Sequence, residues 1–512
     1  MKDKLLALIY ALNPSEVRYF KQFASRTQQQ GDKNYIHLFD EIVSLKKNDE
    51  SSLVKKLQEK GIKTDFLAAD KNYLYHQILR SLQAYHAESS VNSRVANYLI
   101  QIDILFHKSL YDTAYKLLLK AKKLAQSYHL VEQLLVLLQW ERKISGMTLG
   151  EDEVLLLFEE IDQQISLLHN LNDFNRLYYR ITFLRKKLFN LRNNDELVKL
   201  QEIMQNPLLH DTEQAQSIFA KIRYYEIYAN YYYLTHQTVA EFNANHSIIQ
   251  MYNQDHIEEH TTDYVAHYSR YLRLLAAVKP ENFKESLEHF KDIPKLVRKI
   301  SPRLAAQVAI LAVGIAINHA IKYHDFEKTV YLLQEEQSIL EQHSHYISDE
   351  QKTITHYRFA YICLIEGDYS SAIDYANYII NRFNENISPE IRFYARLIQL
   401  IIHYETNNFQ ILPYIIRTAR EAFEKRKTLQ HSEKIILNFM IKLAHQYPNF
   451  DWRNLLIPLR HKLIQVFEVN HFNRIVLNYF DIIAWIDSKS ANISFKEALL
   501  QARTYNNKDK EQ

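Results

Sequence analysis

Glycine is scarce in this chain, and its scarcity limits the folds that the chain can adopt. The 512 residues include six Gly and nine Pro, whereas globular proteins average about 7% and 5% of these residues. Sheets joined by tight hairpins need Gly or Asn in left-handed turns, but helices joined by short polar bends do not. We therefore expect an all-α protein.

Length, charge and cysteine content narrow the class further. At 512 residues the chain exceeds one compact core, so we expect several domains or one extended array. The 63 Lys+Arg and 60 Asp+Glu leave a net charge of +3, which is too balanced for a general polyanion binder. Cys363 is the single cysteine and excludes an intrachain disulfide framework or a thiolate metal cluster. We expect a reducing compartment and a cytoplasmic protein.

Helix length divides the sequence into four segments. The first 90 residues predict about five short helices, whereas later residues predict long amphipathic helices with short polar breaks, as a stack of helical hairpins requires. We expect a small helical domain or cap at 1–90, a helical-hairpin solenoid at 91–470, C-terminal capping helices at 471–505 and a disordered polar tail at 506–512.

The N-terminus combines features of a secretory signal with features of a folded helix. Lysines precede an apolar run at residues 5–12, but Asp3 lies among them and no small-residue cleavage site follows. The sequence Asn13-Pro14-Ser15-Glu16 instead predicts a helix start, with Asn13 as the cap and Glu16 reaching back to it. No apolar run approaches the roughly 18 to 20 residues of a membrane-spanning helix. We therefore expect neither a leader nor a membrane span.

Four breaks between predicted helices share one form: ENFKESLEHF, HDFEKTVYLL, GDYSSAIDYA and NNFQILPYII. Each has a polar residue or Gly, then an aromatic residue, then a new amphipathic run. The aromatic residues, Phe283, Phe326, Tyr369 and Phe409, are spaced 43, 43 and 40 residues apart. This period predicts a divergent helical-hairpin repeat.

The segment GDYSSAIDY, residues 367–375, resembles the turn and second-helix start of a tetratricopeptide repeat. Tyr369 matches the aromatic residue that follows the turn, and Ala372 matches the small residue that lets the two helices approach closely. Phe359 and Ala360 match a large and a small position of the first helix.

The resemblance has two departures. Ala376 and Ile379 replace the aromatic residue and the Ala of the second helix, and the period exceeds the family's 34 residues. The resemblance implies a right-handed α-α superhelix, that is, a tetratricopeptide-like α-solenoid of antiparallel helical hairpins with lengthened helices. A HEAT-like helical repeat is the alternative, because its period is closer.

The strongest catalytic-looking motif is HIEEH, which fits the inverted zinc-protease pattern. If one helix continues through it, the potential ligands His256, His260, Asp263 and His267 share one stripe, and imidazole with carboxylate suits zinc. With 23 His, about one such His pair is expected by chance, so the motif is weak. One straight helix also cannot surround a tetrahedral ion. A zinc-dependent hydrolase is thus an alternative function that needs ligands from a second helix.

Other catalytic patterns are lacking in the sequence. No two glycines have the spacing of a P-loop or a dinucleotide-binding turn. Cys363 falls on the apolar packing face of its predicted helix, which favours a buried, inert thiol over a nucleophile. We therefore expect no enzymatic activity and no cofactor.

Tyrosine is unusually common, with 36 residues. In the densest run, residues 223–236, one helical face carries Tyr224, Tyr228, Tyr231 and Tyr232. Tyrosine suits both helix packing and binding grooves, so we favour packing and keep a ligand-contacting concave surface as the alternative.

A basic cluster that contains Arg417 and Arg420 is a further candidate for the concave surface. A solvated helix face is its simpler interpretation. Aligned along one groove, such residues would suit an acidic peptide or a nucleic-acid backbone.

These observations favour a non-enzymatic scaffold that binds another protein or an extended peptide, since an α-solenoid offers a long concave surface. The alternative is a nucleic-acid-associated or regulatory protein in which residues 1–90 form an accessory helical module.

Overall fold

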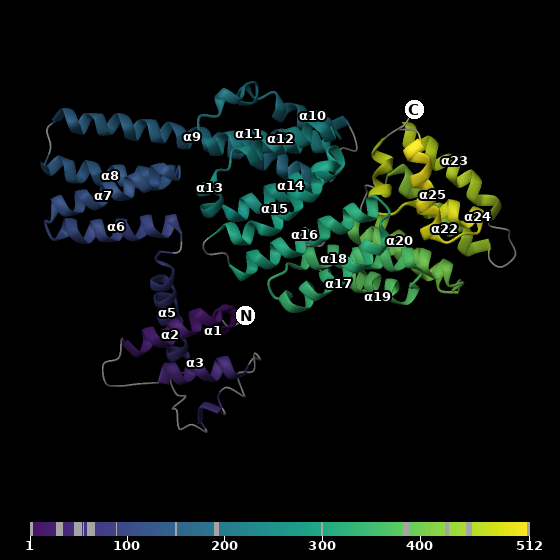
Figure 1. Cartoon of the computed structure of the whole chain (residues 1–512), viewed down its shortest axis with the longest axis horizontal. Helices are drawn as coiled ribbons and strands as arrows, with labels where there is room; N and C mark the ends of the chain where they lie inside the picture. The colour runs from purple at the N-terminus through teal and green to yellow at the C-terminus, as the bar shows by residue number, and fades with distance from the viewer. Residues whose placement is uncertain are drawn as a thin grey trace. The chain divides into compact units, whose positions relative to one another are not determined.

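The computed structural model gives the course of the chain for most of its length. Every regular element in the described part is a helix (Figure 1), so the all-α prediction is confirmed. The described residues are 4–26, 34–45, 54, 56–58, 67–88, 90–148, 151–188, 194–297, 301–381, 389–408, 410–424, 430–446, 453–469 and 471–508.

Contacts divide the chain into two compact units, Met1–His169 and Asn170–Gln512. The division falls inside one long helix, α9 (Glu151–Leu188). The finer segments expected from the sequence, with boundaries near residues 90, 470 and 505, stay a prediction. Helix α25 (Phe495–Lys508) includes the first residues of the expected disordered tail, and residues 509–512 lie outside the described part.

The first unit begins with a group of short helices that share one buried cluster. Leu5, Leu6 and Ile9 from the first helix lie in this cluster with Phe39 and Leu74. The apolar N-terminal run is thus part of a packed core. The helices are α1 (Lys4–Ala11), α2 (Pro14–Arg26), α3 (Asn34–Leu45) and α5 (Leu67–His86).

The capping box predicted at Asn13 is confirmed. Asn13 Oδ1 accepts hydrogen bonds from the backbone N–H groups of Ser15, at 2.9 Å, and Glu16, at 3.0 Å. The Glu16 carboxylate in return accepts from the Asn13 N–H at 2.8 Å. These bonds satisfy donors that the first turn of a helix leaves open.

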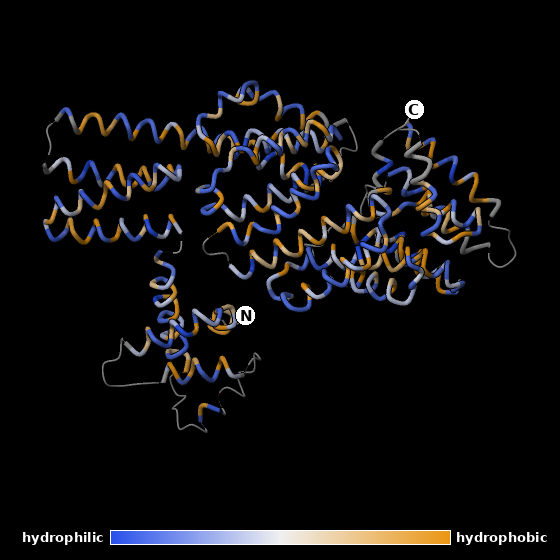
Figure 2. The backbone as a smooth tube through the Cα atoms, in the orientation of Figure 1, coloured by the Kyte–Doolittle hydropathy of each residue, from blue (hydrophilic) through white to orange (hydrophobic). Residues whose placement is uncertain are grey.

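Three long helices follow in the first unit: α6 (Val91–His107), α7 (Tyr111–Ser127) and α8 (Val131–Thr148). Each packs against the next, and α6 also contacts α8. Along each of these helices hydrophobic and hydrophilic residues alternate (Figure 2), as expected for a helix with one buried face. Lys122 of α7 pairs with Glu141 and Glu160 at 2.8 Å each.

The second unit continues the pattern with a longer series of helices. Most helices pack against the next along the chain, and α14 and α18 also contact the second-next helix. This is the contact pattern of successive antiparallel hairpins. The helices after α9 are α10 (Asn194–Met204), η1 (Pro207–Leu209), η2 (Thr212–Gln214), α11 (Ile218–Leu234), α12 (Thr238–Gln250), α13 (Gln254–Glu259), α14 (Thr261–Val278), η3 (Pro280–Asn282), α15 (Phe283–Leu296), α16 (Pro302–Lys322), α17 (Phe326–His343), α18 (Asp349–Glu366), α19 (Tyr369–Asn381), α20 (Pro389–Glu405), α21 (Leu412–Glu424), α22 (His431–Gln446), α23 (Arg453–Val469), η4 (His471–Asn478), α24 (Ile482–Ala491) and α25.

One turn recurs at the C-terminal ends of helices in both units. A residue in the left-handed region is followed by a residue whose N–H donates to the carbonyl five positions back, at 2.8–3.0 Å. This bond defines the Schellman motif. Among the described residues with this conformation Gly367 is the one glycine; the full set is Ser109, His129, His236, His324, Gly367, Asn407 and Asn492. A chain poor in glycine therefore makes glycine-type turns with polar residues, at a conformational cost of roughly 1–2 kcal/mol each.

The recurring turn accounts for part of the sequence period. His324, Gly367 and Asn407 are 43 and 40 residues apart, and Phe326 and Tyr369 stand two positions after the first two of them. Phe283 is different, because the 3-10 turn η3 precedes it. Phe409 lies outside the described residues. The family identity of the repeat stays a prediction.

Gly367 ends α18 as the sequence predicts, with φ of 81°. Asp368 then accepts from the Ser371 N–H at 3.1 Å, and Ala372 is fully buried between the two helices. Phe359, Ala360, Ala376 and Ile379 are buried too.

The expectation of no membrane span stays a prediction, because one described helix has the length and hydropathy of a span. Within the described residues α16 is long and apolar enough by length and composition. The apolar run of α16 is interrupted in the sequence by Gln307, Asn318 and His319, so it is not one continuous apolar stretch. Of the qualifying stretch, 61% is buried, and a core helix passes the same test.

We expect Gly367→Ala to destabilise the α18–α19 turn by about 1–2 kcal/mol. A Cβ at this position meets nothing within 4 Å, so the loss comes from the left-handed backbone alone. Hydrogen exchange of the α18 amides measures it. Gly367→Asn is the control and should lose less, because Asn tolerates this conformation; equal losses would contradict the backbone explanation.

Candidate functional site

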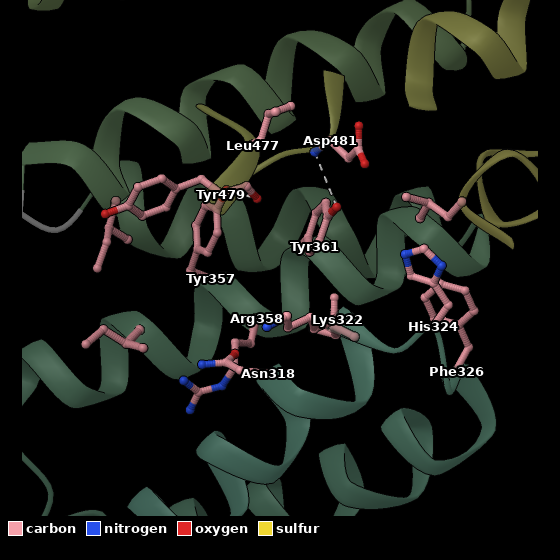
Figure 3. Close-up of a pocket in the computed structure, with 14 residues that line it drawn as sticks. Asn318, Lys322, His324, Phe326, Tyr357, Arg358, Tyr361, Leu477, Tyr479 and Asp481 are labelled. Carbon is pink, nitrogen blue, oxygen red and sulfur yellow. Dashed lines mark hydrogen bonds between the residues drawn. The ribbon is translucent and has the colours of Figure 1, made fainter. Parts of the chain in front are cut away.

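A cavity of about 540 Å³ lies inside the second unit (Figure 3). Its volume is within the range of roughly 300–1,000 Å³ that is usual for ligand pockets. Helices α16, α17, α18 and α20 form one side, and the C-terminal segment from η4 to α25 forms the other. The lining residues are Asn318, Ile321, Lys322, His324, Phe326, Ile354, Tyr357, Arg358, Tyr361, Ile391, Leu477, Tyr479, Asp481 and Leu499. We call this cavity the aromatic pocket.

Helix α18 provides the polar wall of the aromatic pocket. Ile354, Tyr357, Arg358 and Tyr361 recur at intervals of three and four residues, so they share one helical face. Figure 3 shows Tyr357 and Tyr361 directed toward the C-terminal segment. The Tyr357 hydroxyl donates to the Tyr479 carbonyl at 3.1 Å, and the Tyr361 hydroxyl accepts from the Asp481 N–H at 3.4 Å.

Burial changes the acid-base behaviour of these groups. It raises the pKa of Tyr357 and of Tyr361 well above the ordinary value for tyrosine, so both hydroxyls stay protonated. Burial also raises the pKa of Asp481, and the hydrogen bond from the Ala484 N–H opposes that rise in part. Asp481 Oδ1 accepts from the Ala484 N–H at 2.9 Å and caps α24.

Arg358 lines the aromatic pocket as one member of a buried ion pair. Its guanidinium donates to both carboxylate oxygens of Glu336 on α17, through Nε at 3.2 Å and through Nη2. The Thr355 hydroxyl donates to the same carboxylate at 3.0 Å. Glu336 is 0% exposed and Arg358 is 7% exposed.

Gly314 makes room for this ion pair. It lies in the middle of α16, and a Cβ at this position would stand 2.7 Å from Arg358 Nη2 and 3.0 Å from Cζ. The guanidinium therefore rests directly on the backbone of α16. The ion pair connects three successive helices beside the pocket.

The C-terminal segment is held against the helical hairpins by further polar contacts. Glu405 at the end of α20 accepts from Trp485 Nε1 at 2.8 Å and from Lys489 Nζ at 2.6 Å. Lys496 pairs with Glu366 of α18 at 2.8 Å. The segment thus forms one side of the pocket and extends the same hydrophobic cluster, in which Trp485 and Phe480 are buried.

The aromatic pocket combines an apolar lining with a few polar groups. Its described lining includes no cysteine or serine, and His324 is its single histidine. Aromatic and aliphatic side chains provide apolar area, and Asn318 and Lys322 add polar groups at one side. A ligand with an apolar body and a polar end would fit this combination.

The tyrosines predicted as binding candidates contribute to packing. Tyr224, Tyr228 and Tyr231 pack against a buried cluster in the second unit. The Tyr228 hydroxyl donates to the Leu209 carbonyl at 2.8 Å, and Tyr232 contacts the rings of Tyr228 and Tyr231. These contacts agree with the packing interpretation, and none of the four tyrosines lines the aromatic pocket.

The basic candidates Arg417 and Arg420 lie on the exposed face of α21. Arg417 stands 5.6 Å from the centre of the Tyr414 ring. Neither arginine lines the aromatic pocket, and a shared groove stays a prediction.

The structure does not bring the four candidate metal ligands together as one helical stripe. Helix α13 ends at Glu259, His260 is not helical, and α14 begins at Thr261. His267 bonds instead to Glu226 at 3.0 Å and to the Tyr252 hydroxyl at 3.0 Å. Among the described residues no group of three or more His, Cys, Asp or Glu side chains is placed to hold a metal ion. His256 and Asp263 therefore belong to no such group.

Cys363 packs against the hydrophobic cluster around α18 and is half-buried. Burial, and secondarily the nearby Asp368 and Glu366 charges, raise the pKa of its thiol to about 11. The thiol is therefore protonated at neutral pH, as expected for an inert cysteine.

Sequence reasoning missed the aromatic pocket. One signal was available: Gly314 interrupts an apolar helix, and a lone glycine at such a position often marks a close approach. The pairing of α18 with a segment 120 residues later leaves no local pattern.

Searches against protein-family models, curated proteins and solved structures each found no match.

We expect Gly314→Ala to destabilise α16–α18 by roughly 2 kcal/mol or more. Alanine favours a helix over glycine by about 1 kcal/mol, but the new methyl displaces Arg358, and breaking a buried ion pair costs about 3–5 kcal/mol. Hydrogen exchange of the α18 amides measures the loss. Gly146→Ala in α8 is the matched control: its Cβ meets nothing within 4 Å, so that variant should be stabilised. Stabilisation by both substitutions would rule out the steric role of Gly314.

We expect Glu336→Gln to destabilise the same helices by about 3–5 kcal/mol, because it leaves the Arg358 charge buried without its counter-ion. The double variant Glu336→Leu/Arg358→Met should recover most of this loss, since an apolar pair of similar size avoids desolvation of both charges. Urea denaturation followed through the tyrosine signal compares the three proteins. A double variant no more stable than Glu336→Gln would contradict this account.

Proposed function

We propose that this protein is a non-enzymatic scaffold that binds an extended peptide segment of another protein. In this proposal the helical hairpins build a tetratricopeptide-like right-handed α-solenoid, and an apolar or aromatic side chain of the peptide enters the aromatic pocket. The pocket is the observation that carries the proposal.

The lining of the aromatic pocket supports a peptide ligand. Phe326, Ile354 and Ile391 offer an apolar surface for an anchor side chain. Asn318 and Lys322 can hydrogen-bond to peptide carbonyl groups, because both carry N–H donors. Large anchors that fill such pockets dominate the affinity of many peptide complexes.

The hairpin architecture supports the scaffold part of the proposal. The same left-handed turn ends α16, α18 and α20, so three successive hairpins are joined in the same way. Repeated units of this kind present long surfaces to extended ligands. A cytoplasmic location would match the single, protonated Cys363, and it too is part of the proposal.

The alternative functions stay hypotheses. A nucleic-acid-associated or regulatory role would need basic residues such as Arg417 and Arg420 to align along one surface. A zinc-dependent hydrolase would need ligands besides those around His256.

Peptide display on the purified full chain tests the proposal. We expect enriched peptides to share one aromatic or large aliphatic anchor. Leu477→Trp should weaken their binding at least tenfold, because this lining residue is 37% exposed and a larger ring there narrows the pocket. Isothermal titration calorimetry with the enriched peptide measures the effect.

Val469→Trp is the matched control, since Val469 is 88% exposed on the neighbouring helix α23 and does not line the pocket. It should bind like the wild type. Failure to enrich any peptide, or equal binding by Leu477→Trp and the wild type, would refute the proposal.

A further inference from the structure

Helix α16 presents one face to the polar side of the aromatic pocket. Gly314, Asn318 and Lys322 follow one another at intervals of four residues, so they share this face. Asn318 and Lys322 both line the pocket. Residues at this spacing have Cβ atoms about 5–6 Å apart, so the amide of Asn318 and the ammonium of Lys322 can reach one small ligand group.

Arg358 of α18 takes the place that Gly314 leaves open on this face. A Cβ at position 314 would stand 2.7 Å from Arg358 Nη2 and 3.2 Å from Nη1. The guanidinium therefore lies one helical turn from Asn318. Figure 3 shows Asn318, Lys322 and Arg358 grouped at one side of the pocket. Three side chains with N–H donors thus follow one another along a single helix face.

The Arg358 guanidinium has donors that its ion pair does not use. Its hydrogen bonds leave from Nε and Nη2 and end on Glu336 and Thr355. Nη1 carries two more N–H groups, and within the described part of the chain it donates to no acceptor. Arg358 is 7% exposed and lines the cavity. Since buried donors need acceptors, we infer that an occupant of the pocket supplies one.

The charges at this side of the pocket add up to one positive charge. Glu336 neutralises Arg358, and Lys322 adds a single charge. Asp481 is the acidic residue of the described lining. Figure 3 shows it at the opposite side of the pocket. A ligand group with one negative charge would balance the polar side, whereas a phosphate dianion would exceed its charge.

We propose that the aromatic pocket binds a small monocarboxylic acid with an apolar body. The carboxylate accepts hydrogen bonds from Arg358 Nη1, the Asn318 amide and the Lys322 ammonium. The apolar body lies against the remaining lining. The acid and the proposed peptide anchor would compete for one cavity, and only this competition rests on the proposed function.

A carboxylate matches the donors at the polar side better than a neutral group does. It has two oxygens with about four acceptor sites, and donors from three side chains surround it here. Hydrogen bonds to a charged acceptor are roughly twice as strong as neutral ones. Removal of a carboxylate from water is unfavourable unless the charge is paired and hydrogen-bonded, and Lys322 supplies the counter-ion.

The rest of the lining suits an apolar body. The Tyr357 hydroxyl donates to the Tyr479 carbonyl, so Tyr357 offers its ring to a ligand. Ile354, Ile391 and Leu499 add aliphatic surface. A cavity of about 540 Å³ has room for an aryl acid or a medium-chain fatty acid.

Calorimetric titration of the full chain at neutral pH tests the site with two matched pairs of probes. Naphthylacetate and its neutral amide, naphthylacetamide, have almost the same shape, as have octanoate and octanamide. We expect saturable binding of at least one acid, with an affinity about tenfold or more above that of its amide, because the carboxylate makes charge-assisted bonds. Absence of saturable binding by both acids, or equal binding of acid and amide, would overturn the proposal.

Lys322→Met should weaken binding of the acid about tenfold, because it removes the counter-ion and one charge-assisted hydrogen bond. The affinity for the amide should change much less. Asn318→Ala is a second variant and should weaken binding of the acid about fivefold, since one hydrogen bond is lost. Both residues are exposed, so the fold should be retained, which circular dichroism checks.

Lys284→Met is the matched control, since Lys284 is an exposed lysine of α15 that does not line the pocket. It should bind the acid like the wild type. Unchanged affinity in Lys322→Met, or an equal loss in Lys284→Met, would contradict the assigned carboxylate position.

A competition experiment separates this inference from the proposed function. The acid that binds should displace an enriched peptide from the full chain. Peptides that bind while no acid does would refute the acid site alone. An acid that binds with the expected preference, when no peptide can be enriched, would support the acid site and refute the peptide proposal.

Discussion

The buried ion pair between Glu336 and Arg358 is the interaction on which the centre of the second unit depends. Two charges removed from water are unfavourable unless their hydrogen bonds are complete, and here Thr355 and both carboxylate oxygens complete them. The pair also requires Gly314, because any side chain at this position would occupy the space of the guanidinium. One polar contact thus fixes the spacing of α16, α17 and α18. The aromatic pocket follows from that spacing, since Arg358 and its neighbours on α18 form its wall.

The pocket equally depends on residues far along the chain. The Tyr357 hydroxyl donates to the backbone carbonyl of Tyr479, and the Tyr361 hydroxyl accepts from the backbone N–H of Asp481. The Glu405 carboxylate accepts hydrogen bonds from Trp485 and Lys489. Hydrogen bonds to backbone atoms depend little on the side chains of the C-terminal segment, whereas the contacts of Glu405 require particular partners. The C-terminal segment therefore has two physical roles: it covers the apolar cluster of α18 and α20, and it forms the second side of the aromatic pocket.

The sequence predicts the structural features that depend on neighbouring residues in the chain. Scarce glycine indicated an all-α chain, and the Asn13 capping box and the Gly367 turn were both correct, because each depends on neighbours within a few residues. The left-handed residues His236 and His324 were not predicted, since histidine only occasionally adopts this conformation. The stripe of candidate metal ligands required one helix through His256 and His267, and the structure has two helices there, α13 and α14. Thr261 bonds through its side chain to the Ile257 carbonyl at 2.6 Å, and such bonds compete with helical geometry. The aromatic pocket could not be predicted, because it joins segments about 120 residues apart.

The tyrosines of α11 dominated its sequence pattern and concealed its other face. Periodicity shows which residues share a face but not which face meets solvent, and here the tyrosine face is the structural one. On the opposite face Arg223 has Glu226 as its counter-ion, and Arg185 of α9 donates to the Asn230 amide oxygen at 2.6 Å. Buried polar groups need partners, so this face can pack against α9 only where those partners stand. The polar residues of α11 thus fix its position against α9, and the tyrosines fix it against the buried cluster.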